Sequence, residues 1–371
     1  MILGFDASSY LEVLEKGGTY TVHGEKVDPF LYLHDVNGCS YLRLRLWVDP
    51  YDEDGHPYGG GTNDLVKFIA LAKKGHQDGY QILLDFHFSD FWCDPGKQYI
   101  PKSWPKDDFT ALSETLGNYV KDTLEAIQAV GIPIAAIQIG NEITNGMLWP
   151  LGKIEWDEAT DTRHGYENLT HLLKVGIASA KAIFPAAKIL IHLERSYDQA
   201  VYVEYFDELA KAGVEYDIIG LSYYPYWHHS FEELFANIDA LQKRYGKETW
   251  IVETSYGFTY ETAYKESIPF PPLVNEKLFE KGDAREPYPL TKEGQVEFIT
   301  TLLSKAKEHQ VGAVFYWEPL WLPLPGTSWA SKEGEMYINE TEKPCTNEWA
   351  NQCLFDYDGE ATPGCFAYRV D

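Results

Sequence analysis

The sequence predicts an α/β chain folded as one (β/α)8 barrel, the TIM-barrel architecture, over residues 1–371. Three observations favour this fold. Eight short apolar runs recur along the chain, and most of them are separated by helix-length segments. The runs are continuous rather than alternating in polarity, as in parallel strands that are covered on both faces. Polar residues gather at the ends of the runs, where such barrels carry their chemistry.

The expected elements follow one another in a regular order. Strands are predicted at Ile2–Phe5, Tyr41–Trp47, Gln81–Phe86, Ala135–Ile139, Lys188–Leu193, Tyr216–Ser222, Thr249–Thr254 and Ala313–Trp317. Helices between them are predicted at Asp64–Lys74, Ala111–Ala129, Tyr166–Ile183, Ala200–Ala212, Phe231–Tyr245 and Thr291–Glu308. A chain of 371 residues with 44% hydrophobic content can bury one large core, and no Ser/Gly/Pro-rich linker divides it into domains.

Two connections are longer than the others. One follows the seventh strand, at Gly257–Pro289, and the other follows the eighth strand, at Glu318–Asp358. Loops of this length inside a compact domain are usually binding structures or disordered segments. Their content of Pro, Trp and Asn favours binding structures.

Charge and aromatic content indicate the kind of partner. The chain has 31 basic and 57 acidic residues, a net charge of −26, which repels nucleic acids, anionic membrane surfaces and polyanionic polysaccharides. Aromatic residues make up 15% of the chain, and their rings can stack on the apolar faces of sugars. The expected partner is therefore a neutral polysaccharide or oligosaccharide, bound by a monomer.

The N-terminal sequence and the cysteine content indicate the cellular compartment in which the protein is expected. No basic segment followed by an apolar run and a cleavage site begins the sequence, and no stretch approaches the length of a transmembrane helix. The five cysteines are odd in number and lack CxxC spacing, which favours a reducing compartment without structural zinc. We therefore expect a cytoplasmic protein. Secretion, with a signal peptide absent from this sequence, is the alternative, and it would allow a Cys345–Cys353 or Cys353–Cys365 disulfide.

Two glutamates carry the functional prediction. Glu142 follows the run Ile137–Asn141, and Glu253 follows Trp250–Val252. A carboxylate behind a buried strand is costly unless it is paired or functional. Two of them on separate strands of one barrel are what retaining hydrolysis of a glycosidic bond requires. We predict that Glu142 is the general acid/base, with a raised pKa, and that Glu253 is the ionised nucleophile. The alternative is a solvated loop glutamate or a helix cap.

Two further residues are expected to support these glutamates. Asn141 directly precedes Glu142, and an Asn there can hydrogen-bond the sugar 2-hydroxyl. Arg43 and Arg45 share one face of the second strand by alternation, and Arg45 is nearer the C-terminal end. A guanidinium inside a barrel is costly unless it meets a carboxylate. We predict that Arg45 holds Glu253, and that Arg43 is a structural residue paired lower in the barrel.

Other polar residues at strand ends are predicted to bind substrate: His87, Asp90, His192 and Tyr224. Asp85, His87 and Asp90 lie close in sequence, which also raises the possibility of a metal site and a metal-dependent barrel hydrolase. That site would need more ligands, with His192 the other well-placed candidate, and no HxH or HExxH motif is present. We therefore predict no metal and assign His87 and His192 to recognition of sugar hydroxyls.

Three tryptophans are candidate sugar platforms. Trp317, at the end of the eighth strand, is predicted to form the floor of a sugar subsite, and Trp92 and Trp329 to wall neighbouring subsites. Core packing is the competing explanation for each of them.

At these motifs the chain resembles the endo-β-1,4-galactanases of glycoside hydrolase family 53. The resemblance runs almost end to end, and the long phrase after the third strand is specific to the family, whereas the Asn-Glu pair is shared across its clan. The matching phrases are Leu42–Pro50, Leu83–Gln98, Gln138–Ile143, Gly146–Pro150, Asp217–His228, Val252–Tyr256, Tyr316–Pro319 and Asn347–Gln352.

The resemblance implies that Glu142 is the acid/base, that Glu253 is the nucleophile, and that the substrate is β-1,4-galactan, including type I arabinogalactan. Some bacterial members bind calcium after the seventh strand, but Thr259–Ser267 offers sparse ligands, so we predict no calcium and no cofactor. Two local departures are Cys93, where the family usually has Ala, and His229, where Gly is common.

Three alternative functions are considered. A related endo-glycanase of the same clan, acting on β-mannan or β-glucan, would use the same machinery. A barrel that only binds carbohydrate is disfavoured by intact Glu142 and Glu253. The metal-dependent hydrolase is the third alternative.

Overall fold

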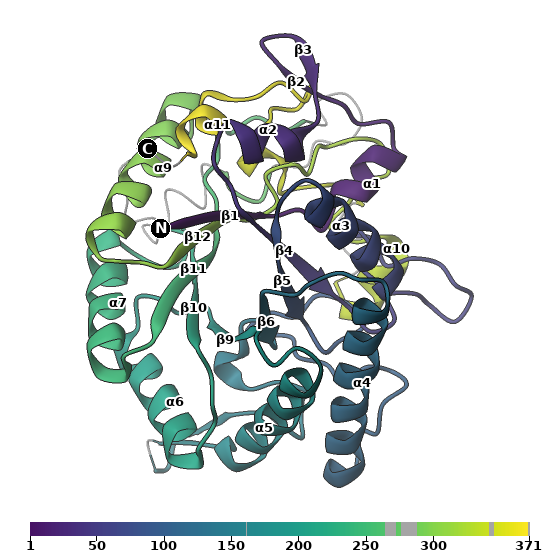
Figure 1. Cartoon of the computed structure of the whole chain (residues 1–371), viewed down its shortest axis with the longest axis vertical. Helices are drawn as coiled ribbons and strands as arrows, with labels where there is room; N and C mark the ends of the chain where they lie inside the picture. The colour runs from purple at the N-terminus through teal and green to yellow at the C-terminus, as the bar shows by residue number, and fades with distance from the viewer. Residues whose placement is uncertain (161, 264–271, 276–287, 341–344, 370–371) are drawn as a thin grey trace.

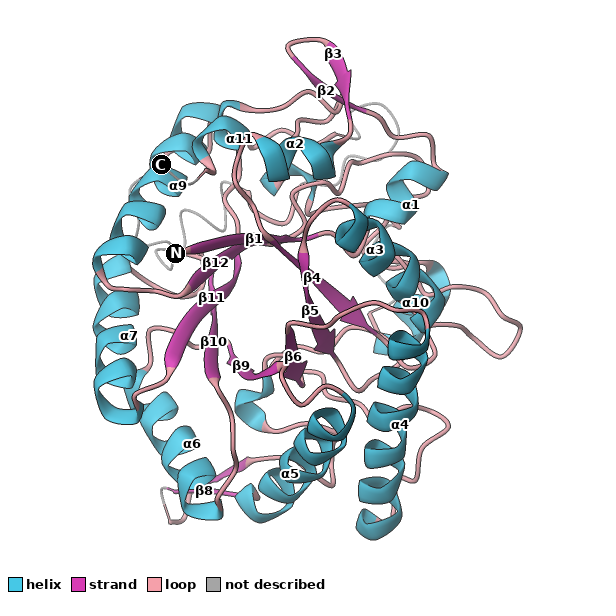
Figure 2. Cartoon of the chain, in the orientation of Figure 1, coloured by secondary structure: helices cyan, strands magenta, loops and turns pink. Residues whose placement is uncertain are grey.

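The computed structural model describes residues 1–160, 162–263, 272–275, 288–340 and 345–369. Within these residues, eight parallel strands close into a barrel in the order β1-β12-β11-β10-β9-β6-β5-β4. Figure 1 shows the strands at the centre with the longer helices around them, and Figure 2 shows the same arrangement by secondary structure. The predicted (β/α)8 barrel is confirmed.

The eight strands lie within two residues of their predicted ends. They are β1 (Ile2–Asp6), β4 (Tyr41–Leu46), β5 (Gln81–Phe86), β6 (Ala136–Ile139), β9 (Lys188–Leu193), β10 (Ile218–Tyr223), β11 (Glu248–Thr254) and β12 (Ala313–Tyr316).

The six predicted helices are also confirmed, as α3 (Leu65–Gln77), α4 (Phe109–Ala129), α5 (Tyr166–Ile183), α6 (Gln199–Ala212), α7 (Phe231–Tyr245) and α9 (Lys292–Glu308). Side-chain caps define most of their starts, because the preceding residue accepts a first-turn backbone N–H at Asp64, Asp108, Asp198, Ser230 and Thr291. Some short helices were not predicted from the sequence, namely α1 (Tyr10–Glu15), α2 (Pro29–Asp35), α10 (Lys332–Ile338) and α11 (Pro363–Ala367). So few residues show no clear helical period.

Smaller elements decorate the connections. Two antiparallel hairpins are formed by β2 (Tyr20–Val22) with β3 (Glu25–Val27), and by β7 (Glu155–Asp157) with β8 (Thr162–His164). Short 3-10 turns follow β6, at η1 (Ile143–Asn145), and precede α11, at η2 (Ala350–Gln352). The long connection after β12 thus contains α10 and η2. In the connection after β11, residues 264–271 and 276–287 lie outside the described residues.

Alternate strand residues build an apolar floor inside the barrel, separate from the main core between strands and helices. Two positions farther along the same strands, the inward residues are polar: Asp85 follows Leu83, and His192 follows Leu190. A polar layer therefore rests on the floor, whose residues are Leu83, Ala136, Leu190, Ile218, Trp250, Val252, Ala313 and Phe315.

A β-bulge turns Glu253 into this polar layer. Val252 belongs to the floor and Ile251 to the outer core, so regular alternation would point Glu253 outward. The pairing with β10 shifts here, because Leu221 lies opposite Ile251 whereas the next residue, Ser222, lies opposite Glu253. The extra residue reverses the alternation, and the Glu253 side chain faces inward.

None of the described helices is both long and apolar enough to cross a membrane. All five cysteines are free thiols, and Cys345 is the exposed one, so neither of the two disulfides considered above is formed.

The floor leaves no room at Gly4. A Cβ there would lie 2.4 Å from a ring carbon of Phe315 and 2.9 Å from the backbone oxygen of Tyr41. We expect Gly4→Ala to lower the free energy of unfolding by about 1–3 kcal/mol through overpacking, as measured by urea denaturation. Gly96→Ala is the matched control, since its Cβ would meet only the Asp94 carboxylate, at 3.3 Å. An equal loss in both variants would contradict the packing argument.

Candidate active site

Glu142 and Glu253 meet around Ser222 at the C-terminal end of the barrel. Glu142 follows β6 with its backbone in the left-handed region, at a φ of 49°, a conformation that is costly for a non-glycine residue and concentrates at functional sites. Its Oε1 accepts a hydrogen bond from Ser222 Oγ at 2.6 Å. Glu253 is the direct strand partner of Ser222 and is 6% exposed. The two glutamates singled out from the sequence are therefore neighbours.

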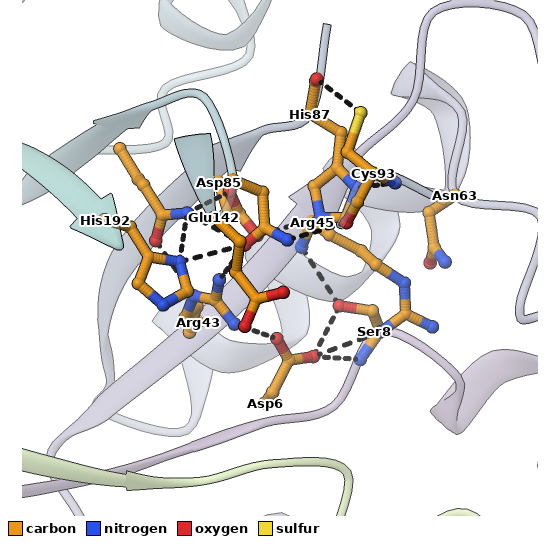
Figure 3. A network of polar contacts seen from close by, with 12 residues as sticks. Asp6, Ser8, Arg43, Arg45, Asn63, Asp85, His87, Cys93, Glu142 and His192 are labelled. Atoms are coloured by element: carbon orange, nitrogen blue, oxygen red, sulfur yellow. Dashed lines mark hydrogen bonds and ion pairs between the residues drawn. The ribbon is translucent and has the colours of Figure 1, made fainter. Parts of the chain in front are cut away.

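Arg43 lies close to Glu142 and Asp6 in the polar layer (Figure 3), and all five of its guanidinium N–H groups are in use. The group makes ion pairs with three carboxylates from β1, β5 and β11, and donates to two side-chain amide oxygens. The acceptors are Asp6 at 3.2 Å, Glu253 at 2.8 Å, Asp85 at 2.8 Å, Asn141 at 2.9 Å and Gln138 at 3.2 Å. A buried guanidinium is tolerated when it is paired and fully hydrogen-bonded in this way.

The prediction that Arg45 holds Glu253 is wrong, and Arg43 does so instead. The long side chains extend along the strand: Arg43 pairs in register with Leu83 but bonds Asp85, two residues farther on. The Arg45 side chain also reaches about two residues beyond its own position on the strand, so its guanidinium lies past the strand ends. There it donates to Glu318 and to the backbone oxygen of Gly60. Figure 3 shows the two guanidinium groups diverging, with Arg45 extending toward Asn63.

The two catalytic candidates differ in their electrostatic surroundings. Burial raises the pKa of Glu142 well above its usual range, and the charges of Glu253 and Glu194 raise it further. Burial also raises the pKa of Glu253, to about 7, but the Arg43 guanidinium opposes this shift. Tyr224 donates to Glu253 as well, at 3.0 Å. Glu253 is therefore the first of the two to ionise, and Glu142 keeps its proton to higher pH.

Glu194 is a third carboxylate that the sequence analysis missed. It directly follows β9, is 6% exposed, and accepts a hydrogen bond from Thr144 of η1. Its other oxygen lies 3.1 Å from Arg195 Nε. The signal that identified Glu142 and Glu253, a carboxylate behind an apolar strand, also applies to Glu194, because the residues before it are Ile189–Leu193.

His192 links the polar layer to Glu142. The Nε2 atom of His192 lies 2.8 Å from Ser222 Oγ, which donates to Glu142, and Nδ1 lies 3.0 Å from Asn141 Oδ1 and 3.2 Å from Gln138 Nε2. Burial lowers the pKa of His192 well below its ordinary value, and the charge of Arg43 lowers it further. His192 is therefore a neutral hydrogen-bond relay that orients Ser222.

His87 supports the layer from the side. Its Nδ1 accepts from the indole N–H of Trp47 at 3.1 Å, which leaves the proton on Nε2 for Asp85, also at 3.1 Å. The backbone N–H of Cys93 approaches the same Nδ1 at 3.3 Å. Both ring nitrogens are thus engaged within the protein.

The remaining candidates divide into two groups. Asn141 joins the centre through Arg43 and also donates to the backbone oxygen of Cys93 at 3.0 Å. Tyr224 joins it through Glu253. Asp90 does not join it: this carboxylate accepts from Lys102 N at 2.7 Å and from the Tyr337 hydroxyl at 3.3 Å, so it fastens the loop after β5 to α10.

The aromatic candidates form one cluster beside the carboxylates. Trp92 and Trp329 stack at 4.3 Å, and the Arg45 guanidinium lies 4.4 Å over the Trp92 ring. Since ring and guanidinium cannot share one face, Trp92 is covered on both sides and Trp329 is the more open of the two. Trp317 packs edge-on against Trp349 at 4.5 Å, a buried residue that the sequence analysis did not single out.

A metal centre is not assembled from the residues considered for one. Within the described ranges, the only group with suitable spacing is Asp52, Asp54 and His56, which includes none of His87, Asp90 and His192. Of the stretch Thr259–Ser267, residues 264–267 lie outside the described residues.

His229, the residue at which the family commonly has Gly, has a backbone φ of 60°. This is the left-handed conformation that glycine adopts most readily.

Comparisons with known proteins show which family and which solved structures the chain is similar to. The family model described as glycosyl hydrolase family 53 matches residues 2–367. An endo-β-1,4-galactanase of Bacillus subtilis (strain 168) is 31% identical over 392 residues, covering 99% of this chain and 85% of the relative. The Ignisphaera aggregans GH53 catalytic domain superposes with a TM-score of 0.87 at 34% identity, covering 99% of this chain and 95% of the other. A structure of fungal β-1,4-galactanases gives 0.76 at 27% identity, with coverages of 99% and 98%.

Glu194 can be tested by its effect on Glu142. Removing its charge by Glu194→Gln removes a repulsion that favours the protonated form of Glu142, so the pKa of Glu142 should fall. Carbon-13 NMR titration of the glutamate side-chain carboxyls measures this directly. Glu208→Gln, in α6, is the control with the same chemistry. An unchanged Glu142 titration in Glu194→Gln would rule out the electrostatic link.

Proposed function

The chain belongs to glycosyl hydrolase family 53, and from this premise we propose that it is a retaining endo-β-1,4-galactanase acting on galactan and type I arabinogalactan. The single observation that carries the proposal is the pair of carboxylates at Ser222, of which Glu253 meets a guanidinium and Glu142 meets no cation among the described residues. This difference matches the division of roles between nucleophile and acid that double displacement needs.

In the first step, Glu253 attacks the anomeric carbon while Glu142 gives its proton to the departing glycosidic oxygen. A covalent glycosyl ester forms on Glu253, and the leaving-group sugar departs as an alcohol. Arg43 and Tyr224 favour the ionised form of Glu253 against the effect of burial, and they fix the direction of its oxygens. Ser222 holds Oε1 of Glu142, which leaves Oε2 for the proton that is transferred.

In the second step, Glu142 acts as a base. Esterification removes the negative charge of Glu253, which is the first of three carboxylate charges that raise the pKa of Glu142. Glu142, now ionised, takes a proton from water, the water oxygen attacks the anomeric carbon, and Glu253 leaves as a carboxylate. Two inversions give net retention, and the initial protonation states return. The side chains of the chain suffice, so we propose no cofactor.

The substrate assignment rests on the relatives, whose names specify β-1,4-galactan. A net charge of −26 suits a neutral polymer rather than a polyuronate. We propose that Trp329 and Trp317, with Asn141, contact the sugar ring, and that His87 and His192 act through Asp85 and Ser222 instead of touching it. A β-mannanase or β-glucanase is the alternative within the same machinery.

The wider biological context is part of the proposal. We propose one catalytic domain over residues 1–371, active as a monomer, with neutral polysaccharide as its partner and neither nucleic acid nor membrane. A cytoplasmic location is supported by the free thiols, four of them buried. Cell fractionation with an antibody tests the location, and recovery in the medium would refute it.

The first test is substrate choice. Linear β-1,4-galactan, β-mannan and β-glucan are incubated in parallel with the enzyme, with and without chelator, and reducing ends and product sizes are measured. We expect short galacto-oligosaccharides from galactan alone, with no effect of the chelator. Cleavage of another glycan but not galactan would replace the substrate, and loss of activity in chelator would restore the metal-dependent alternative.

The nucleophile is tested by Glu253→Ala. We expect turnover to fall by more than about 10³-fold, because no covalent intermediate can form. Azide added to this variant with an activated β-galactoside should restore part of the turnover and give the α-glycosyl azide, since a single displacement inverts the anomeric centre. A β-configured product, identified by NMR, would show that Glu253 is not the nucleophile.

The acid is tested by Glu142→Ala. General acid catalysis contributes about 10²–10⁴-fold, and only where the leaving group needs a proton. The variant should therefore be strongly impaired on galactan and far less on a dinitrophenyl β-galactobioside, in steady-state measurements of kcat/KM. Equal loss on both substrates would count against Glu142 as the acid.

A further inference from the structure

A cavity of about 510 Å³ lies between the β7–β8 hairpin and the segment after β9, which includes the start of α6. Its walls come from the segment after β6, which forms the β7–β8 hairpin, and from the segment after β9. The polar and aromatic residues that line it are Asn145, Trp156, Arg163, Arg195, Asp198 and Glu204.

Two of these residues connect the cavity to the centre. Asn145 ends η1, the turn that begins directly after Glu142. Arg195 pairs with Glu194, which accepts a hydrogen bond from Thr144 of the same turn. The inner wall is therefore built on the residues that immediately follow the ends of β6 and β9, whereas Glu253 lies on β11, beyond β10.

The chemistry gives this side of the centre a defined role. The acid must stand next to the oxygen that it protonates, so the leaving-group part of the polymer lies on the side of Glu142. We propose that the cavity is a subsite for the leaving-group arm of the substrate, a β-linked chain of neutral hexoses. This inference rests on the proposed function and adds the place where the departing sugars are held.

Trp156 supplies the platform. It is 54% exposed, the one tryptophan among the exposed large apolar side chains, and it lies on β7 opposite Arg163 of β8. In the part of the chain that the structure describes, no other ring packs against it. An indole held open on a hairpin can stack on the apolar face of a pyranose, as aromatic side chains with a free face do.

The polar lining suits hydroxyl groups. Two guanidinium groups and two carboxylates balance in charge, so the cavity favours neither an anion nor a cation. Arg163 Nη1 is buried and has no hydrogen-bond partner among the described residues. Glu204 accepts from the Tyr166 hydroxyl at 3.3 Å, and Asp198 caps α6, each through one oxygen. Within the described ranges their other oxygens have no hydrogen-bond partner, so these oxygens are available to sugar hydroxyls.

The test compares a substrate that reaches the cavity with one that does not. Reducing-end-labelled β-1,4-galactohexaose carries sugars on the leaving-group side, whereas nitrophenyl β-galactobioside carries only an aryl group. We expect Trp156→Ala to lower the ratio of kcat/KM for hexaose to that for the aryl glycoside by about tenfold. The labelled fragment should also become shorter on average, as cleavage moves toward the reducing end. Trp156→Tyr keeps a ring and should restore most of the ratio.

Two results would overturn the subsite. One is an unchanged ratio and an unchanged fragment length in Trp156→Ala, and the other is equal loss on both substrates, which a general effect on folding would produce. Thermal unfolding of each variant identifies that second case. Failure of the proposed function is distinct, because the wild-type enzyme would then cleave neither galactan nor galactohexaose.

Discussion

The buried guanidinium of Arg43 is the interaction on which the rest of the active centre depends. Its five N–H groups join side chains from β1, β5, β6 and β11, so one group fixes the relative position of half the barrel strands at their C-terminal ends. A cation in this interior is tolerable only because three carboxylates surround it, and those carboxylates are tolerable only because of the cation. Loss of the guanidinium would leave Asp6, Asp85 and Glu253 buried together, and among the described residues the one arginine still paired with them would be Arg45, at 3.6 Å from Asp6.

The same charge creates the asymmetry that the chemistry needs. Glu253 is buried and Glu142 is partly buried, and desolvation raises the pKa of both, so burial alone cannot distinguish a nucleophile from an acid. The distinction comes from what each one touches: Glu253 meets Arg43 and a tyrosine hydroxyl, and Glu142 meets a serine whose orientation is set by neutral His192. Because His192 is kept neutral by its burial beside Arg43, the guanidinium governs the surroundings of both carboxylates.

The sequence predicted the strands, the longer helices and the glutamate pair because each rests on a local signal. Continuous apolar runs mark parallel strands, and a carboxylate behind such a run marks a strand end. The exchange of roles between Arg43 and Arg45 was not predictable in this way, since it depends on how far a side chain extends along the strand. The bulge at Val252 was equally hidden, because strict alternation points Glu253 outward. Trp156 stayed unnoticed because a three-residue strand has no readable period.

The barrel strands and the β7–β8 hairpin are therefore under different structural constraints. Catalytic residues stand on strands whose register, floor and ion pairs over-determine their positions, so a change at Asp85 or Gln138 would disturb several groups at once. The β7–β8 hairpin is attached through the segment after η1 and contributes to none of the Arg43 contacts. Sequence changes there can alter how the departing part of the polymer is held while the carboxylate pair keeps its geometry. In this architecture product length is free to vary by substitution on the hairpin, whereas the chemistry of bond cleavage is not.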